Sequence, residues 1–355
     1  MRGVNYHRAW EAEAEGDVAG IDLAQEGGQC FVGTASGQLV FYGPDGEPRW
    51  QSSLPNPVAG VRCGRRGGHA VALTSERELA AFDGDGELLW IKELPFEADC
   101  FDLRPGSNLI TVGNRYGIYR YLTIHGKLMS GGRLNHPIDF VRFAPGGGSC
   151  ALACEDGHVS LIEGADRVRW TVFVHRAIIG LDVAVEAQFI LVPSRDRGIV
   201  AIDADGQGVG VYELREPIRV AEVDDTGKHI VLLDHNGKLM VLDREARLLF
   251  MRPCFSAAAD GEGKLRVAGE SWVEMAAGSV TDSDREHAPL PLVTDATRLA
   301  VNGDGSRLAV AGSGGAVQYY RRSDVSIEAS EFVEVGVKAG TLRREGDDPV
   351  GYLEV

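Results

Sequence analysis

Residues 7–10 (HRAW) and 47–50 (EPRW) are each followed, eight positions after the tryptophan, by a related phrase: residues 18–22 (VAGID) and 58–62 (VAGVR). Residues 87–90 (ELLW) repeat the first phrase once more. Self-similarity at a fixed spacing is the sequence pattern of a repeat architecture, in which each repeat is one unit of supersecondary structure.

The tryptophans set the length of the repeat. Trp10, Trp50, Trp90 and Trp170 share one phase of a 40-residue period, so four of the five tryptophans in the chain mark the same position. Within a period, short apolar runs are interrupted by Gly, Asp, Asn and Pro, a pattern typical of strands of about five residues. In the first unit we expect four strands, at residues 20–24, 29–34, 38–42 and 48–52.

A repeated unit of four antiparallel strands predicts a β-propeller, because radial closure buries both faces of each sheet and protects its edges. From about residue 6 to about residue 325 there is room for eight periods. We therefore predict an all-β chain with a single propeller of eight four-stranded blades, and seven as the alternative if the blade at 255–293 is incomplete. The expected blades lie near residues 18–55, 56–95, 96–135, 136–175, 176–215, 216–254, 255–293, and 294–322 together with 6–14.

The amino-terminal phrase lies on the phase of a fourth strand, although no first three strands precede it. The last blade supplies three strands, so we expect residues 7–13 to become its outer strand and close the ring. Residues 326–332 (SIEASEF) fall on the same phase and are the alternative. Trp10 carries the motif residue and Ser330 does not, which favours the amino-terminal strand. Residues 326–355 are then an extension that packs on or beside the last blade.

Two known kinds of repeat resemble these phrases. Residues 42–50 (YGPDGEPRW) and 82–90 (FDGDGELLW) are similar to the repeat of quinoprotein-type (PQQ-like) propellers, whose blades end in an Asp-Gly turn and a Trp-bearing outer strand. Residues 302–311 (NGDGSRLAVA) resemble the first turn and second strand of WD-repeat propellers. Both resemblances imply blades, and neither implies a particular active site.

The quinone-dependent enzymes of the first group would bring a quinone pocket, a calcium site and adjacent paired cysteines. This chain has no neighbouring Cys pair, since Cys150 and Cys154 lie four residues apart. These enzymes are exported, and the outer-membrane assembly scaffold of the same fold is exported and lipid-anchored. We see no export signal in the first residues, so the resemblance leaves a cytosolic propeller used as a docking platform.

The amino-acid composition and charge of the chain limit what it is expected to bind. The 355 residues are 44% hydrophobic and carry 36 basic against 52 acidic residues, a formal charge of −16. A surface of that sign repels phosphate backbones, so we expect no nucleic-acid partner. No apolar run approaches the roughly 20 residues of a membrane span, so we expect no membrane insertion. Six cysteines without an export signal indicate reduced thiols and a cytoplasmic location.

Charged residues mark the end of the first strand in six successive blades, and their signs alternate over the first five. In a closed ring these positions are neighbours around the axis, so opposite charges can pair between blades. Ala258 and Ala300 hold the same place in the last two expected blades. We interpret this inner charged ring as structural; the alternative is a polar channel mouth that opens to a ligand beside the alanines. Its members are Asp22, Arg62, Asp102, Arg142, Asp182 and Glu222.

Partner proteins usually meet the propeller face that carries the connections between blades and the turns between second and third strands. Arginine and histidine gather in these loops on an otherwise acidic chain, and arginine binds carboxylates in a bidentate way. We therefore expect partner contact there, possibly with an acidic contact surface; a solvated loop face is the alternative. The candidate residues are Arg115, Tyr116, His136, His175, Arg176, Arg195, Arg197 and His235.

We expect no catalytic residues, no metal and no cofactor. The nine histidines are dispersed and form no ligand pair at metal spacing, and no nucleophile elbow or phosphate-binding loop is present. The function expected from the sequence is a non-catalytic scaffold for protein–protein interaction in a cytosolic assembly. The alternative is small-molecule binding or a lactonase-like hydrolytic enzyme at the central channel mouth, and pairing within the charged ring would decide against it.

Overall fold

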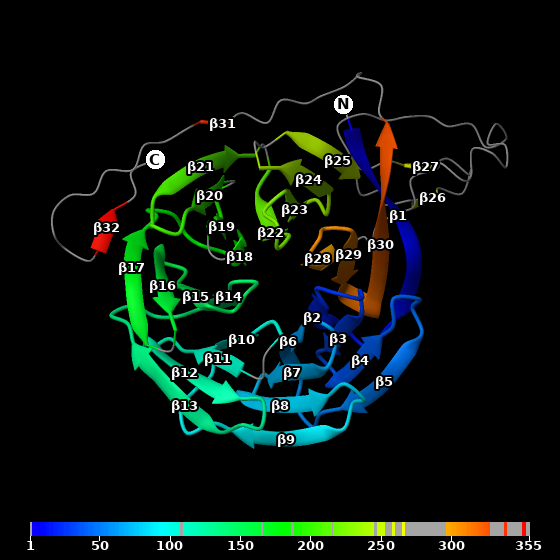
Figure 1. The fold of residues 1–355 in the computed structure, drawn as a ribbon. Coiled ribbons are helices and arrows are strands. Elements are labelled where there is room, and N and C mark those ends of the chain that lie inside the picture. Colours follow the sequence, from blue (N-terminus) through cyan, green and yellow to red (C-terminus); the bar gives the residue numbers. More distant parts are fainter. Residues whose placement is uncertain are drawn as a thin grey trace.

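The alternating apolar runs of the chain form short strands, and the sheets that they build stand around a central axis (Figure 1). The computed structural model describes residues 2–252 except 107–108, 165, 186–187, 197, 215 and 245–246, and then 258–259, 265–266, 296–326, 337–338 and 350–352. Within these residues, seven sheets radiate from the axis, each built on four antiparallel strands with the first strand innermost. The chain is therefore an all-β propeller.

Blades 1 to 6 follow one another along the chain. Blade 1 contains β2 (Val18–Leu23), β3 (Cys30–Thr34), β4 (Gln38–Tyr42) and β5 (Pro48–Ser53). Blade 2 contains β6 (Val58–Cys63), β7 (His69–Thr74), β8 (Glu78–Asp83) and β9 (Leu88–Glu93). Blade 3 contains β10 (Cys100–Leu103), β11 (Leu109–Gly113), β12 (Ile118–Thr123) and β13 (Leu128–Arg133).

The next three blades repeat this order. Blade 4 contains β14 (Phe140–Phe143), β15 (Ser149–Ala153), β16 (His158–Glu163) and β17 (Arg167–Phe173). Blade 5 contains β18 (Asp182–Ala184), β19 (Phe189–Pro193), β20 (Gly198–Ile202) and β21 (Gly208–Glu213). Blade 6 contains β22 (Ile218–Val223), β23 (His229–Asp234), β24 (Leu239–Asp243) and β25 (Leu248–Arg252).

Blade 7 joins the two ends of the propeller sequence. Its inner strands are β28 (Ala296–Val301), β29 (Arg307–Gly312) and, after the short 3₁₀ helix η2 (Ser313–Gly315), β30 (Ala316–Ser326). The amino-terminal strand β1 (Arg2–Glu13) pairs antiparallel with β30 and is the outermost strand of this sheet. The competing residues 327–332 lie outside the described part of the chain.

The number of blades corrects the prediction of eight and agrees with the alternative of seven. Blades 6 and 7 touch directly, because the Val301 backbone N–H donates to Glu222 Oε2 at 3.0 Å. Buried Val231 and Leu233 of blade 6 also pack with Leu299 of blade 7. The blade expected at 255–293 lies mostly outside the described residues, apart from two paired two-residue strands, β26 (Ala258–Ala259) and β27 (Leu265–Arg266).

Two short strands near the carboxyl end lie on the outer rim of the ring (Figure 1). Strand β31 (Val337–Lys338) pairs antiparallel with β21, and β32 (Val350–Tyr352) pairs parallel with β17. Both strands extend the sheets of blades 4 and 5. In the described part of the chain, no helix has the length and apolar character that crossing a membrane requires.

The outer-strand tryptophans Trp90 and Trp170 each contact the following blade, which explains why this residue recurs at a fixed spacing. The indole N–H of Trp90 donates to the Ile124 carbonyl, 34 positions later in the next blade, at 2.6 Å. Trp170 donates in the same way to the Ala204 carbonyl at 2.8 Å. Both tryptophans thus bind the turn between the third and fourth strands of the following blade, the position that the Asp-Gly phrases occupy in blades 1 and 2.

Glycine is required in these turns because the tryptophan lies directly against it. Gly86 has a φ of +86°, and a Cβ added there would lie 2.6 Å from Cγ of Trp50. Trp50 is in turn stacked between Phe41 and Phe82, with ring centroids 5.2 and 5.6 Å away. The Asp-Gly turn of one blade and the outer-strand tryptophan of the blade before it therefore pack against each other.

We predict that Gly86→Ala destabilises the protein more than Gly164→Ala does. Both positions have positive φ, which costs an L-residue roughly 1–2 kcal/mol, but no atom lies within 4 Å of a Cβ added at Gly164. The additional loss for Gly86→Ala should be about 1 kcal/mol or more, the usual cost of overpacking. Equilibrium urea denaturation of both variants measures the difference, and equal losses would contradict the packing explanation.

Candidate functional site

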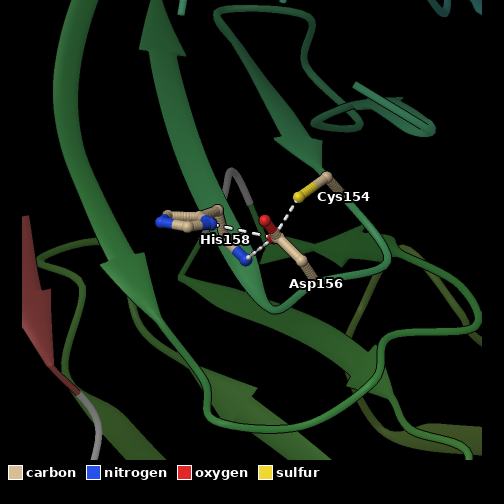
Figure 2. A group of neighbouring side chains, drawn as sticks. All are labelled: Cys154, Asp156 and His158. Carbon is tan, nitrogen blue, oxygen red and sulfur yellow. Dashed lines mark hydrogen bonds and ion pairs between the residues drawn. The ribbon is translucent and has the colours of Figure 1, made fainter. Parts of the chain in front are cut away.

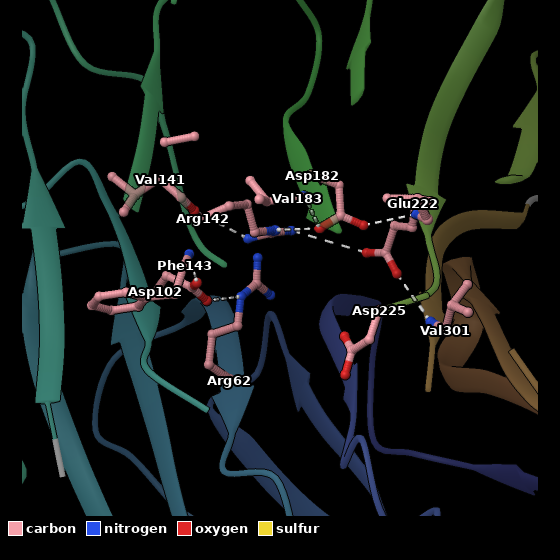
Figure 3. A network of polar contacts seen from close by, with 12 residues as sticks. Arg62, Asp102, Val141, Arg142, Phe143, Asp182, Val183, Glu222, Asp225 and Val301 are labelled. Atoms are coloured by element: carbon pink, nitrogen blue, oxygen red, sulfur yellow. Dashed lines mark hydrogen bonds and ion pairs between the residues drawn. The ribbon is translucent and has the colours of Figure 1, made fainter. Parts of the chain in front are cut away.

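The six residues of the inner charged ring do come together at the axis. Each lies near the end of the innermost strand of its blade, close to the turn between first and second strands. They line a cavity of about 80 Å³ together with Gln25 and Asp225. Arg62 and Arg142 reach inward from neighbouring sides of this cavity (Figure 3).

The carboxylates of the ring bind the backbone of the next blade. Asp22 Oδ2 accepts the N–H of Cys63 at 2.7 Å, and Asp102 Oδ2 accepts the N–H of Phe143 at 2.7 Å. Asp182 and Glu222 repeat the contact with the N–H groups of Val223 at 2.8 Å and Val301 at 3.0 Å. Four junctions between blades therefore contain the same acid-to-amide hydrogen bond.

The two arginines connect the remaining pairs of adjacent blades from 1 to 7. Arg62 Nε donates to Asp102 Oδ1 at 3.0 Å and joins blade 2 to blade 3. Arg142 Nε lies 3.7 Å from Asp182 Oδ1 and joins blade 4 to blade 5. Arg142 Nη2 also lies 4.0 Å from Glu222 Oε1. Polar contacts of the ring thus run without interruption from blade 1 to blade 7.

The last junction, between blades 7 and 1, is held differently because Ala300 has no polar side chain. Arg298 Nε donates to the Ala19 carbonyl at 2.8 Å, and Tyr319 Oη donates to the Gly28 carbonyl at 2.8 Å. The Gly303 N–H donates to the Gln25 carbonyl at 3.2 Å. These bonds close the ring where the pattern of charged residues ends.

Four carboxyl groups and only two guanidinium groups share the ring, and this imbalance affects protonation. Burial raises the pKa of Asp102 to about 7, although Arg62 opposes the shift. Burial raises the pKa of Asp182 to about 7 as well. The pKa of Glu222 is raised well above its ordinary value by burial and by the charge of Asp182.

On the opposite face, three of the arginines expected to meet a partner lie against carboxylates of this same chain. We call this the loop face; it carries the turns between second and third strands and the connections between blades. Arg115 Nη2 lies 2.7 Å from Glu97 Oε2, and Arg176 Nη1 lies 2.8 Å from Asp196 Oδ2. Arg195 Nη2 lies 4.0 Å from Glu155 Oε2. These ion pairs within the chain offset the local positive charge that led us to expect a partner with an acidic contact surface.

The other expected partner residues differ in accessibility. Tyr116, His175 and His235 are exposed, while His136 is 8% exposed. His136 Nε2 lies 3.0 Å from Ser160 Oγ, and its Nδ1 lies 2.7 Å from the Pro137 carbonyl oxygen. Burial and these two contacts place His136 beneath the surface rather than on it. Arg197 lies outside the described residues.

Tyr116 is an exposed aromatic ring on a rigid turn. Its side chain is 54% exposed, and Arg115 lies over the ring at 5.5 Å from its centroid. Asn114 Oδ1 accepts the backbone N–H groups of Tyr116 and Ile118, each at 3.0 Å, which holds the turn in place. The tip of this turn is therefore ordered before any partner arrives.

A groove of about 410 Å³ lies on the same face, between blades 2 and 3. Its lining includes Arg77, Pro95, Phe96 and Glu97. Glu97 binds Arg77 at 2.8 Å on one side and Arg115 at 2.7 Å on the other. This carboxylate links the groove to the turn that bears Tyr116.

The structure also brings together three side chains that the sequence analysis missed. Cys154, Asp156 and His158 lie in the turn between β15 and β16, and their sulfur, oxygen and nitrogen donor atoms are all within 4.8 Å of one another (Figure 2). Asp156 Oδ1 accepts a hydrogen bond from the Cys154 thiol and lies 2.8 Å from His158 Nδ1. Burial raises the pKa of Cys154 to about 12. The sequence analysis did not bring these three side chains together as possible metal ligands.

Comparison with known proteins agrees with the repeat. Residues 7–116 match the family model PQQ_2, described as outer membrane protein assembly factor BamB. The match covers β2 to β11 and most of β1, and thus the blades with the most regular Trp and Asp-Gly phrases. No curated protein matches the chain.

We predict that Arg62→Met lowers the free energy of unfolding by about 2–3 kcal/mol, because it leaves Asp102 and Asp22 buried near the axis without their nearest cation. The matched control is Arg66→Met, which removes a guanidinium that binds Glu26 at 2.7 Å but is 82% exposed. This exposed pair should contribute little. Thermal and urea denaturation compare the two variants; equal stability of Arg62→Met and wild type would contradict the pairing.

The raised carboxyl pKa values also predict a pH dependence. Asp102 has an ordinary pKa of 3.8 and a folded-state pKa of about 7, so the folded protein binds more protons between these values. Its contribution to stability is complete below about pH 4 and is lost as the pH rises to about 7. Because other groups titrate in the same range, the measurement is the difference between wild type and Asp102→Asn.

The slope of unfolding free energy against pH, measured by urea denaturation from pH 4 to 7, should be more positive in Asp102→Asn than in wild type. Above pH 7.5 the two slopes should converge. Parallel curves over the whole range would show that burial of Asp102 does not raise its pKa.

Proposed function

We propose that this PQQ-like propeller is a non-catalytic scaffold that binds partner proteins on its loop face, within a cytosolic assembly. The observation that carries the proposal is the preorganised pair of Tyr116 and Arg115 beside the groove between blades 2 and 3. Tyrosine and arginine are enriched among the residues that dominate the energy of protein interfaces. The free, buried thiols of Cys30, Cys63 and Cys150 support the cytosolic location.

The internal use of the charged ring favours a scaffold over a channel enzyme. A hydrolytic centre needs groups that are directed at a substrate, whereas each of the four ring carboxylates accepts a backbone N–H of the following blade. Both arginines lie against ring carboxylates. The ring is thus engaged in holding blades together.

The side chains of the loop face fit a partner surface with both apolar and charged groups better than a strongly acidic one. The arginines nearest Tyr116 already bind Glu97, so a partner carboxylate would have to displace an existing ion pair. The groove instead offers Pro95 and Phe96 beside charged edges. We therefore propose that a partner inserts an apolar or aromatic side chain into this groove and covers Tyr116.

We predict that Tyr116→Ala weakens partner binding by about 30-fold or more, the equivalent of at least roughly 2 kcal/mol. The fold should be unaffected, because the Tyr116 side chain is half-exposed and the turn is held by Asn114. Affinity capture with tagged full-length protein and mass spectrometry identifies the partner. Surface plasmon resonance with that purified partner then gives Kd for wild type and variant.

Met129→Ala is the control, because Met129 is also a large exposed side chain, 57% exposed, but lies on the outer strand β13 rather than on the loop face. Its Kd should equal that of wild type. An unchanged Kd for Tyr116→Ala would remove the groove region as the contact surface, and the absence of any stoichiometric partner would contradict the scaffold itself.

A further inference from the structure

The turn between β15 and β16 of blade 4 brings three different donor groups to one point. The Cys154 N–H donates to the His158 carbonyl at 3.0 Å, and the Gly157 N–H donates to the Cys154 carbonyl at 3.1 Å. Cys154 and His158 therefore close the hairpin opposite each other, with Asp156 at the tip between them. The hydrogen-bonded hairpin therefore fixes the backbone positions of all three residues.

The side chains point toward one another from these positions (Figure 2). Nδ1 of His158 lies 2.8 Å from Oδ1 of Asp156, and the thiol of Cys154 contacts the same oxygen. All three donor atoms fall within 4.8 Å. Zinc–ligand bonds are about 2.0 to 2.3 Å long, so one ion could bind all three atoms after small side-chain movements.

Neighbouring rings hold the imidazole of His158 in this orientation. The ring of His136 is stacked on it at 4.9 Å between centroids with an interplanar angle of 10°, and Phe173 packs against it at 4.8 Å. His136 is itself held by Ser160, which bonds Thr171 at 2.8 Å. Outer contacts of this kind orient metal ligands in known sites.

An ion can reach the site from solvent. The side chains of Asp156 and His158 are 53% and 28% exposed, whereas Cys154 is buried beneath them. A buried thiol below two more accessible ligands gives a site that is anchored within the protein and open on the loop face.

Equivalent turns in other blades show which features of this turn are general and which are specific to blade 4. In blade 5, Ser194 Oγ donates to Asp196 Oδ1 at 2.5 Å, and in blade 1, Thr34 Oγ1 and Ser36 Oγ are 2.8 Å apart. A bond between the first and third residues is thus a general feature of this turn. The fifth position is Gly198 in blade 5 and Gln38 in blade 1, so the turn itself requires neither a thiol nor an imidazole.

We infer that Cys154, Asp156 and His158 form a binding site for Zn²⁺ on the loop face of blade 4. Thiolate, imidazole and carboxylate are the three ligand types that zinc takes in proteins. A set containing sulfur and nitrogen disfavours the hard cations Ca²⁺ and Mg²⁺, which take oxygen ligands. Three protein ligands leave a fourth position for water or for a ligand supplied from outside the chain.

Titration of metal-stripped full-length protein with ZnCl₂ tests this inference. Isothermal titration calorimetry should give one tight site per chain, and Zn²⁺ should raise the melting temperature, since a ligand that binds the folded state stabilises it. Cys154→Ser and His158→Ala should each weaken binding by more than roughly tenfold, the loss seen when even outer contacts of a site are removed. With Co²⁺ as the probe, thiolate-to-metal charge-transfer absorption should appear in wild type and be absent from Cys154→Ser.

His235→Ala is the matched control, because it removes an exposed histidine from the equivalent turn of blade 6 and should bind Zn²⁺ as wild type does. Circular dichroism without metal establishes that each variant is folded, and Asp156→Asn provides a third variant if one of the others is not. Weak or substoichiometric binding by wild type would overturn the inference. Equal affinity of folded His158→Ala and wild type would overturn it as well.

Discussion

The hydrogen bond from a backbone amide of one blade to an inner-ring carboxylate of the blade before it is the contact on which this propeller depends. Seven twisted sheets arranged in a circle pack through their apolar faces, and the hydrophobic attraction between those faces has no direction of its own. A carboxylate that accepts a particular N–H fixes the register at the axis. Asp22, Asp102, Asp182 and Glu222 each make this contact, at 2.7 to 3.0 Å.

The ring of alternating charge follows from the same requirement. Carboxylates near the axis are costly to desolvate, and consecutive carboxylates in all blades would repel one another across the channel. Arg62 and Arg142 break the series, and each contacts the acid of the next blade. Far from the axis, Trp90 and Trp170 bind the turn of the following blade through the indole N–H. Blades 2 and 4 are thus attached to the following blade both at the inner end and at the outer rim.

Much of this arrangement could be predicted from the sequence because both attachments recur at a fixed spacing in several blades. The tryptophan phase and the Asp-Gly turns predicted the four-stranded unit, and the phase of Asp22 and Arg62 predicted the charged ring. The blade count could not be settled in the same way. Residues 255–293 span about one period, and it is contacts seen in the structure, such as that of Glu222 with Val301, that show blades 6 and 7 to be adjacent.

The less predictable features are those that do not repeat. Glu97 and Glu155, which bind arginines of the loop face, occupy positions at which the other repeats have no glutamate. Cys154, Asp156 and His158 occur within one turn of one blade, at spacings of two residues. The repeat therefore determines the ring, and departures from the repeat give individual blades the groups that a partner or an ion can bind.

Hydrogen exchange at the Phe143 amide is the most direct measurement of the central claim that ring carboxylates hold successive blades together. This N–H is bound by Asp102, whereas the Cys63 N–H is bound by Asp22 and serves as an internal reference. The account predicts slow exchange of both amides in wild type and faster exchange of Phe143 alone in Asp102→Ala. Rapid exchange of Phe143 in wild type, or no acceleration in Asp102→Ala, would contradict it.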